Sequence, residues 1–176
     1  MPFYEVYHSC PLNQDQRQQL AQAITQLHCE AFKTTPAFFV HVRFFAEENS
    51  ENVYFIAGRP HHLTSNRISG NVRTSAARSK EDFDELATKI EAAWYETLKL
   101  TPPTEKAAWT RDDEEKRLIL VKFVPLVTIR EAGMDAPVAG QEENWLESQL
   151  PYVEAMANKG VGDFADILAE VQGRLL

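Results

Sequence analysis

The chain has 176 residues, of which 44% are hydrophobic and 25% are charged, and its formal net charge is −8. This length and composition predict one globular domain with an adequate hydrophobic core. The acidic balance argues against nucleic acid or an anionic membrane as a partner, because both attract basic surfaces. No apolar run approaches the roughly 18 residues that a membrane-spanning helix needs, and we expect no signal peptide.

The two cysteines, Cys10 and Cys29, are too few for a disulfide framework and favour a reducing cytoplasm. Five histidines are present, but no HExxH motif or ladder of cysteines and histidines accompanies them. We therefore expect a cytoplasmic protein that uses neither a metal nor a cofactor.

The first half of the chain predicts a strand, a helix and a strand. Residues 3–8 alternate between apolar and polar side chains, as a half-buried strand does. A capping box at 13–16 and the apolar stripe after it predict a helix. Residues 38–45 are rich in aromatic and β-branched side chains and predict a strand, and 52–58 predict a small edge strand. His28 lies at the edge of the helix's apolar stripe, so it is either a buried core residue or a donor to a substrate oxygen.

The second half repeats this order. Residues 67–73 predict a strand, and 79–100 predict a helix that begins with acidic side chains in its first turn. The charged run 111–117 is most simply a solvated loop. Residues 118–124 are almost continuously apolar, which is typical of a central parallel strand.

We expect an α/β (α+β) fold in which two fused β-α-β units build a small mixed sheet, with both helices on one face. The other face needs a cover, which favours an oligomer. Residues 141–176 predict two further helical segments, the first interrupted by Pro151. The whole chain, 1–176, is predicted to be a single domain with a core at 1–135 and a helical extension at 136–176.

Pro2 is the most unusual candidate for chemistry. If Met1 is removed by an aminopeptidase, residue 2 carries a prolyl secondary amine at the N-terminus. A free α-amino group titrates at about 7.7–8.0, and an apolar pocket lowers that pKa, so the amine can act as an acid or a base near neutrality. If Met1 is retained, the nitrogen of Pro2 is an amide and cannot take a proton.

Arg73 and Arg78 flank a loop between a predicted strand and a predicted helix. Ligands bind at such loops in α/β sheets, and paired guanidinium groups suit a carboxylate. Taken alone, the two arginines could equally be surface residues. Glu131 follows the last predicted core strand, where it could activate water or accept a proton.

These residues and their surroundings resemble the tautomerase superfamily, and within it the cis-3-chloroacrylic acid dehalogenase group. The fragments that carry the resemblance cover about residues 1–135 and read, in order, MPFYEVYHS, AQAITQLHCEAF, ENVYFIAG, RTSAARSKEDFDELATKI and REAGM. The resemblance implies a β-α-β fold, usually assembled as a homotrimer, in which each pocket opens on an N-terminal proline.

The resemblance also implies roles for individual residues. Pro2 would be the acid and base, His28, Arg73 and Arg78 would bind and polarise a substrate carboxylate, and Glu131 would position or activate water.

Two features depart from the family pattern. The family's arginines are three residues apart, whereas Arg73 and Arg78 are five apart. Lys122 stands where the family has a tyrosine that assists the glutamate with water. A lysine could anchor a carboxylate and lower the pKa of Glu131, but it does not replace a water-activating group.

We therefore expect a tautomerase that acts on small 2-oxo or unsaturated carboxylates through Pro2, with no nucleic acid or membrane partner. Two alternatives stay open. One is a dehalogenase-like or hydratase-like addition of water with Glu131 as the base. The other is an inactive tautomerase fold that serves as a binding or assembly module.

Overall fold

The computed structural model describes residues 2–33, 35–47, 54–60, 65–103 and 108–175. Its centre is a four-stranded sheet whose strands lie in the order β2 (His41–Ala46), β1 (Phe3–His8), β5 (Arg67–Val72) and β6 (Leu120–Pro125). β1 and β2 are parallel, β5 and β6 are parallel, and β1 is antiparallel to β5. The sheet is therefore mixed, as predicted.

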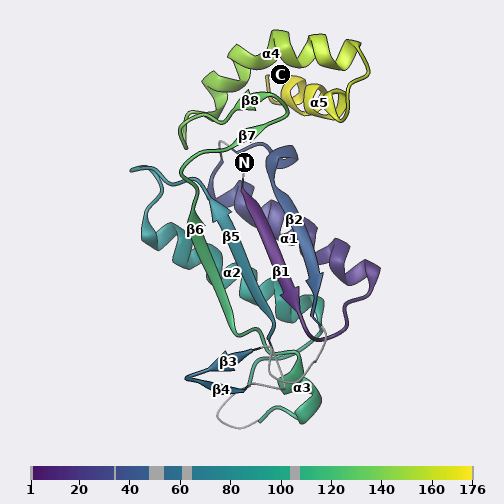
Figure 1. Cartoon of the computed structure of the whole chain (residues 1–176), viewed down its shortest axis with the longest axis vertical. Helices are drawn as coiled ribbons and strands as arrows, with labels where there is room; N and C mark the ends of the chain where they lie inside the picture. The colour runs from purple at the N-terminus through teal and green to yellow at the C-terminus, as the bar shows by residue number, and fades with distance from the viewer. Residues whose placement is uncertain (1, 34, 48–53, 61–64, 104–107, 176) are drawn as a thin grey trace.

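Helix α1 (Gln14–Ala31) connects β1 to β2, and α2 (Lys80–Thr97) connects β5 to β6. Each helix begins at a capping box, on Asn13 and Ser79 respectively, which satisfies backbone N–H groups of the first turn. Figure 1 views the sheet from its uncovered face, with both helices behind it. The predicted pair of β-α-β units with helices on one face is confirmed.

The remaining elements lie beyond the two ends of the sheet (Figure 1). At one end lie the ribbon β3 (Phe55–Ile56) and β4 (Arg59–Pro60), and helix α3 (Arg111–Glu115). At the other end lie the 3₁₀ helix η1 (Ala37–Phe39), the ribbon β7 (Arg130–Glu131) and β8 (Met134–Asp135), and helices α4 (Glu142–Asn158) and α5 (Phe164–Leu175).

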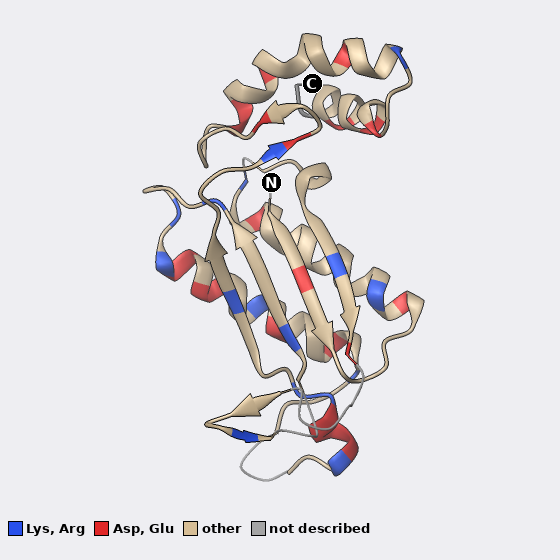
Figure 2. Cartoon of the chain, viewed as in Figure 1, with Lys and Arg blue, Asp and Glu red and all other residues tan. Residues whose placement is uncertain are grey.

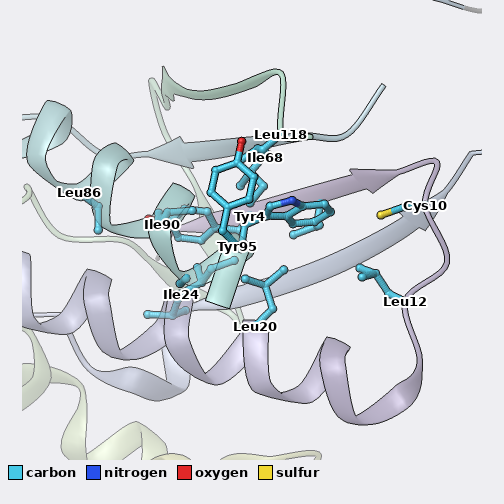
Figure 3. Packing of buried hydrophobic residues seen from close by; sticks show 14 of the residues in the cluster. Tyr4, Cys10, Leu12, Leu20, Ile24, Ile68, Leu86, Ile90, Tyr95 and Leu118 are labelled. Carbon is cyan, nitrogen blue, oxygen red and sulfur yellow. The ribbon is translucent and has the colours of Figure 1, made fainter. Parts of the chain in front are cut away.

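Two hydrophobic clusters stabilise the described chain. The larger one fills the space between the sheet and helices α1 and α2, where Tyr4, Ile24 and Ile90 are fully buried (Figure 3). Full burial of one such side chain contributes about 1.5–3 kcal/mol. The smaller cluster joins η1 and β8 to the C-terminal helices through Phe39, Met134, Leu146, Val153 and Ile167. It crosses the predicted boundary at residue 135, and the division into core and extension stays a prediction.

Several predicted elements differ from the structure. The predicted strand 38–45 begins only at His41, because the preceding residues form η1 and bury Phe39 in the smaller cluster. The predicted loop 111–117 contains α3, which a capping box between Thr110 and Asp113 initiates. Helix α4 continues through Pro151, where the sequence predicts an interruption.

The last strand is also placed differently. β6 is parallel to β5 as expected, but it lies at the edge of the sheet and not at its centre. Its sequence is apolar except for Lys122, and Val121 and Phe123 are its residues that pack against the main core. Of the predicted edge strand 52–58, residues 52 and 53 lie outside the described residues, and Phe55 and Ile56 pair with β4 in a separate ribbon.

Within the described residues, no helix has the length and apolar character needed to cross a membrane.

Replacement of Gly70 tests the packing of the sheet. A Cβ atom at Gly70 would lie 2.8 Å from Cε1 of Tyr4 and 2.9 Å from Cδ1 of Phe123. We expect Gly70→Ala to lower the free energy of unfolding by about 1–3 kcal/mol in urea denaturation. Gly173→Ala in α5 is the matched control, because among the described residues only its chain neighbours and the helix's own backbone come within 4 Å of the added carbon. Equal stabilities of the two variants would contradict the packing described here.

Candidate active site

The candidate residues lie, with one exception, at the end of the sheet where β1 and β2 begin and β5 and β6 end. Pro2 immediately precedes β1 and is buried. Its carbonyl oxygen accepts a hydrogen bond of 3.1 Å from the backbone N–H of His41. Strand alternation places Pro2 on the same face as Tyr4, toward the helices. Met1, whose removal would expose the amine of Pro2, lies outside the described residues.

His28 lies in the last turn of α1 and is only 1% exposed. Its Nδ1 atom lies 2.8 Å from the hydroxyl oxygen of Tyr4. Burial, and then the positive charge of Arg78, lower the pKa of His28 to about 3, so the imidazole is neutral at pH 7. Burial raises the pKa of Tyr4, so its hydroxyl keeps a proton to donate to Nδ1.

A neutral imidazole that accepts at Nδ1 carries its own proton on Nε2. The Nε2 atom of His28 is buried and has no hydrogen-bond partner in the described part of the chain. His28 therefore presents one N–H donor that the described residues leave unused.

Arg73 and Arg78 meet on a shared carboxylate. Arg73 follows the end of β5, and Arg78 precedes the N-cap of α2. Oxygen Oε1 of Glu142, the first residue of α4, lies 2.8 Å from Nη2 of Arg73 and 2.7 Å from Nη2 of Arg78. Its second oxygen, Oε2, accepts a 2.7 Å hydrogen bond from the backbone N–H of Gly140. Glu142 is 2% exposed.

Further contacts fix the two guanidinium groups. Nη1 of Arg73 donates to the carbonyl oxygen of Pro137, while its buried Nε has no partner among the described residues. Arg78 stacks over the ring of Phe32 at 4.7 Å. Burial lowers the pKa of Arg73, and Glu142 opposes that change. Both arginines are thus buried members of one charged cluster rather than surface residues.

Glu131 lies on β7 and reaches back to the start of β2. Its Oε1 atom lies 2.8 Å from Nε2 of His41. In Figure 2, β7 is the short blue and red strand beside the N-terminus. Because the backbone of His41 also binds Pro2, this contact places the Glu131 carboxylate at the proline end of the sheet. A carboxylate held in this way can orient a water molecule or accept its proton.

Lys122 is the exception. It lies in the middle of β6, opposite Ser69, and alternates with Val121 and Phe123, which pack in the main core. Its exposed side chain therefore belongs to the uncovered face of the sheet, away from the arginine cluster of the same chain. A role for Lys122 in substrate binding stays a prediction.

A hollow of about 410 Å³ lies beside Arg78, between α2 and β6. Most of its lining is apolar and includes Phe83 and Phe123. Lys80 also lines the hollow and is paired with Asp84. In the part of the chain that the structure describes, no group of three histidine, cysteine or acidic side chains is placed to hold a metal ion.

Sequence reasoning missed three residues of this site. Tyr4 could have been found, because the strand alternation that predicts β1 also places it on the buried face with Pro2. His41 could have been found from its position at the start of the strand paired in parallel with β1. Nothing in the sequence separates Glu142 from the other 25 acidic residues, because its contacts lie 64 and 69 positions away.

Comparisons with known proteins support the fold. The family model described as putative oxalocrotonate tautomerase enzyme matches residues 1–149. The structure of N1, a member of the cis-3-chloroacrylic acid dehalogenase family, is 21% identical with a TM-score of 0.58 and covers 83% of this chain and 91% of its own. A wild-type fused 4-OT asymmetric trimer is 16% identical with a TM-score of 0.52, and the match covers 76% of this chain and 95% of that protein.

MIF2 of Leishmania major is 15% identical with a TM-score of 0.54, and the match covers 77% of this chain and 97% of that protein. A search of curated proteins found no match. At these identities the structural likeness shows the fold alone, and it agrees with the resemblance seen in the sequence.

The neutral state of His28 makes stability depend on pH. The folded-state pKa of about 3 lies below the ordinary value of 6.5, so the unfolded chain binds a proton here that the folded chain does not. The contribution of the neutral His28 to the free energy of unfolding is therefore fully present above pH 6.5 and is lost as the pH falls toward about 3. We expect His28→Gln to flatten the fall in unfolding free energy between about pH 6.5 and 4.5 in urea denaturation.

Burial also lowers the pKa of His8, so His8 likewise makes the free energy of unfolding fall at low pH. The His28→Gln variant therefore keeps part of the pH dependence. A wild-type protein whose stability does not change over this range would contradict a neutral, buried His28.

Proposed function

Because the chain belongs to the family described as putative oxalocrotonate tautomerase enzyme, we propose that it moves protons between oxygen and carbon in small 2-oxo or unsaturated carboxylates. Pro2, once Met1 is removed, is the acid and base. One observation carries the proposal: a buried Pro2, a neutral buried His28 and a buried arginine pair occupy the same end of the sheet. The arginine pair suits the carboxylate of a substrate. The neutral histidine suits a neighbouring oxygen of the same substrate, on which negative charge develops during the reaction.

The proposed reaction balances without a cofactor. In the enol-to-keto direction the enol hydroxyl loses its proton to solvent, the carbonyl double bond forms, and the carbon–carbon double bond takes a proton from the prolyl ammonium. In the reverse direction the prolyl amine removes a proton from the carbon beside the carbonyl. An apolar environment lowers the pKa of the amine, so that both the prolyl ammonium and the neutral prolyl amine are populated near neutral pH.

The other residues bind and polarise the substrate. Arg73 and Arg78 provide charge-assisted hydrogen bonds to its carboxylate. The unused Nε2–H donor of His28 suits the oxygen on which negative charge develops, because a donor fixed in advance needs no reorganisation during the reaction.

We further propose a homotrimer in the cytoplasm. The uncovered sheet face carries partly buried aromatic side chains, including the stacked rings of Tyr7 and Phe45, which are 4.8 Å apart. The fused 4-OT with the same fold forms a trimer, although an asymmetric one. In such an assembly Lys122 would face a neighbouring copy, and from there it could contribute to a substrate site. Cys10 and Cys29 are not joined in a disulfide, which suits a reducing compartment.

The contact between Glu131 and His41 favours a second reaction, the addition of water to an unsaturated or halogenated acid. Glu131 would take a proton from water while the oxygen attacks one carbon, and Pro2 would protonate the neighbouring carbon. If the chain has neither activity, it is best described as a tautomerase fold that serves as a binding or assembly module.

Replacement of the proline tests the principal proposal. We expect Pro2→Ala to lower the turnover of a small enol-pyruvate by at least about 100-fold, measured by ultraviolet absorbance. Mass spectrometry first establishes whether Met1 is absent from each preparation. Pro11→Ala, which changes an exposed proline, is the control and retains activity. Full activity in Pro2→Ala would refute the mechanism, and an inactive but correctly processed wild type would favour the binding module.

Replacement of Glu131 separates the two reactions. We expect Glu131→Gln to lower water addition by at least about 100-fold and to leave enol-to-keto conversion within a few-fold of wild type, since only the first reaction needs a base for water. Glu147→Gln, at an exposed position on α4, is the control. A parallel loss of both reactions would show that Glu131 does not act on water alone.

A further inference from the structure

We propose that Tyr4 is a positioning residue of the candidate active site, because its hydroxyl group keeps the proton of His28 on Nε2 and holds the imidazole in one orientation. The proposal rests on the proposed function in one respect, namely that this N–H faces the substrate oxygen on which negative charge develops. It adds to the reaction a residue that acts through its neighbour rather than on the substrate.

The direction of the hydrogen bond between Tyr4 and His28 follows from the acceptors around the hydroxyl group. Nδ1 of His28, at 2.8 Å, is the one hydrogen-bond partner of this hydroxyl within the described ranges. Cys29 also acts on Tyr4, but a thiol is a weak acceptor. If Nδ1 carried the proton, the buried hydroxyl would have to turn its hydrogen away from its best acceptor, which is unfavourable. The hydroxyl therefore donates, Nδ1 accepts, and the neutral ring carries its one proton on Nε2.

The imidazole has to be neutral for this arrangement, because a protonated ring has no lone pair with which to accept at Nδ1. Burial is the main cause that lowers the pKa of His28 to about 3, and the charge of Arg78 follows. Arg73 acts in the same direction and Glu142 against it. A prolyl ammonium at this end of the sheet would act in the same direction as the arginines. The ring therefore has one proton to place, whichever charge the amine carries.

Packing holds both rings in place. Tyr4 is fully buried and lies opposite Gly70 in the register of β1 and β5. Gly70 leaves room for the ring, since a Cβ atom there would come within 2.8 Å of Cε1 of Tyr4. The ring of Phe123 meets that of Tyr4 edge to face at 6.4 Å, and Phe32 packs against the imidazole of His28 at 5.0 Å. Such packing does not distinguish the two ring nitrogens, whereas the hydrogen bond from Tyr4 does.

The hydrogen bond from Tyr4 has two effects on the donor at Nε2. It disfavours the tautomer in which Nε2 carries a lone pair, which would repel a negatively charged oxygen. It also draws electron density from the ring, which makes the remaining N–H a stronger donor. Both effects matter most when charge develops on the substrate oxygen, so they stabilise the transition state more than the bound substrate. Loss of the hydroxyl should therefore lower kcat more than it changes KM.

The first experiment measures the tautomer directly. Long-range proton–nitrogen correlation spectra at pH 7 show which ring nitrogen carries the proton, and the spectrum of His28→Gln identifies the signals of His28. We expect wild-type His28 to carry its proton on Nε2, and Tyr4→Phe to populate the form protonated on Nδ1 as well. A wild-type proton on Nδ1, or an unchanged His28 spectrum in Tyr4→Phe, would overturn the proposal.

Tyr95→Phe is the matched control for this experiment. It also removes the hydroxyl group of a buried tyrosine in the main core, but Tyr95 lies in the last turn of α2, at the opposite end of that helix from Arg78. The signals of His28 stay unchanged in this variant.

The second experiment measures enol-to-keto conversion in the same variants. We expect Tyr4→Phe to lower kcat about tenfold and to change KM by less than about threefold, whereas Tyr95→Phe retains both values. A purely structural role would lower the free energy of unfolding in urea denaturation and leave the kcat of the folded enzyme unchanged. That result would overturn the proposal.

A double-mutant cycle shows whether Tyr4 acts through His28. A glutamine amide is a donor that has no tautomers, so in a His28→Gln background we expect Tyr4→Phe to change kcat by less than about twofold. An undiminished loss in that background would show that Tyr4 acts on another group, against the proposal. An inactive wild type would refute the proposed function and the kinetic effect with it, whereas the spectra would still decide whether Tyr4 fixes the tautomer.

Discussion

The carboxylate of Glu142 is the contact through which the C-terminal helices and the sheet depend on each other. Glu142 is the first residue of α4, and its carboxylate holds both Arg73, which follows β5, and Arg78, which precedes the N-cap of α2. Removing one partner of a buried ion pair costs about 3–5 kcal/mol, because the remaining charge is left without compensation. In this chain the loss of Glu142 would leave two like charges facing each other, so the position of the arginines depends on α4.

The second C-terminal helix constrains the other side of the same site. Glu170 of α5 accepts hydrogen bonds from the backbone N–H groups of Ala37 and Phe38, which form the first turn of η1. This turn leads directly into β2, where His41 binds the carbonyl oxygen of Pro2. The helices therefore fix both flanks of the proline end of the sheet. The family model, which ends at residue 149, includes Glu142 and does not reach Glu170.

The sequence predicts those parts of the molecule whose causes are local. The alternation of apolar and polar residues predicts β1, and the capping boxes at Asn13 and Ser79 predict where the helices begin. The order of strands and helices predicts two β-α-β units. Prediction fails where distant packing decides. The apolar sequence of β6 could not reveal its place at the edge, and local pattern could not show that Phe39 leaves the strand for a second cluster.

The candidate site follows the same division. Pro2 and the arginines are recognisable because their chemistry or spacing is unusual, whereas Glu142 acquires its role only when α4 folds back over the sheet. That role extends to the proline. Two uncancelled guanidinium charges at this end of the sheet would disfavour the prolyl ammonium and lower its pKa further. Glu142 offsets one of these charges, and a neutral His28 adds none. In the proposed reaction, a substrate carboxylate bound to these arginines would raise the proton affinity of the prolyl amine, which then acts as the acid.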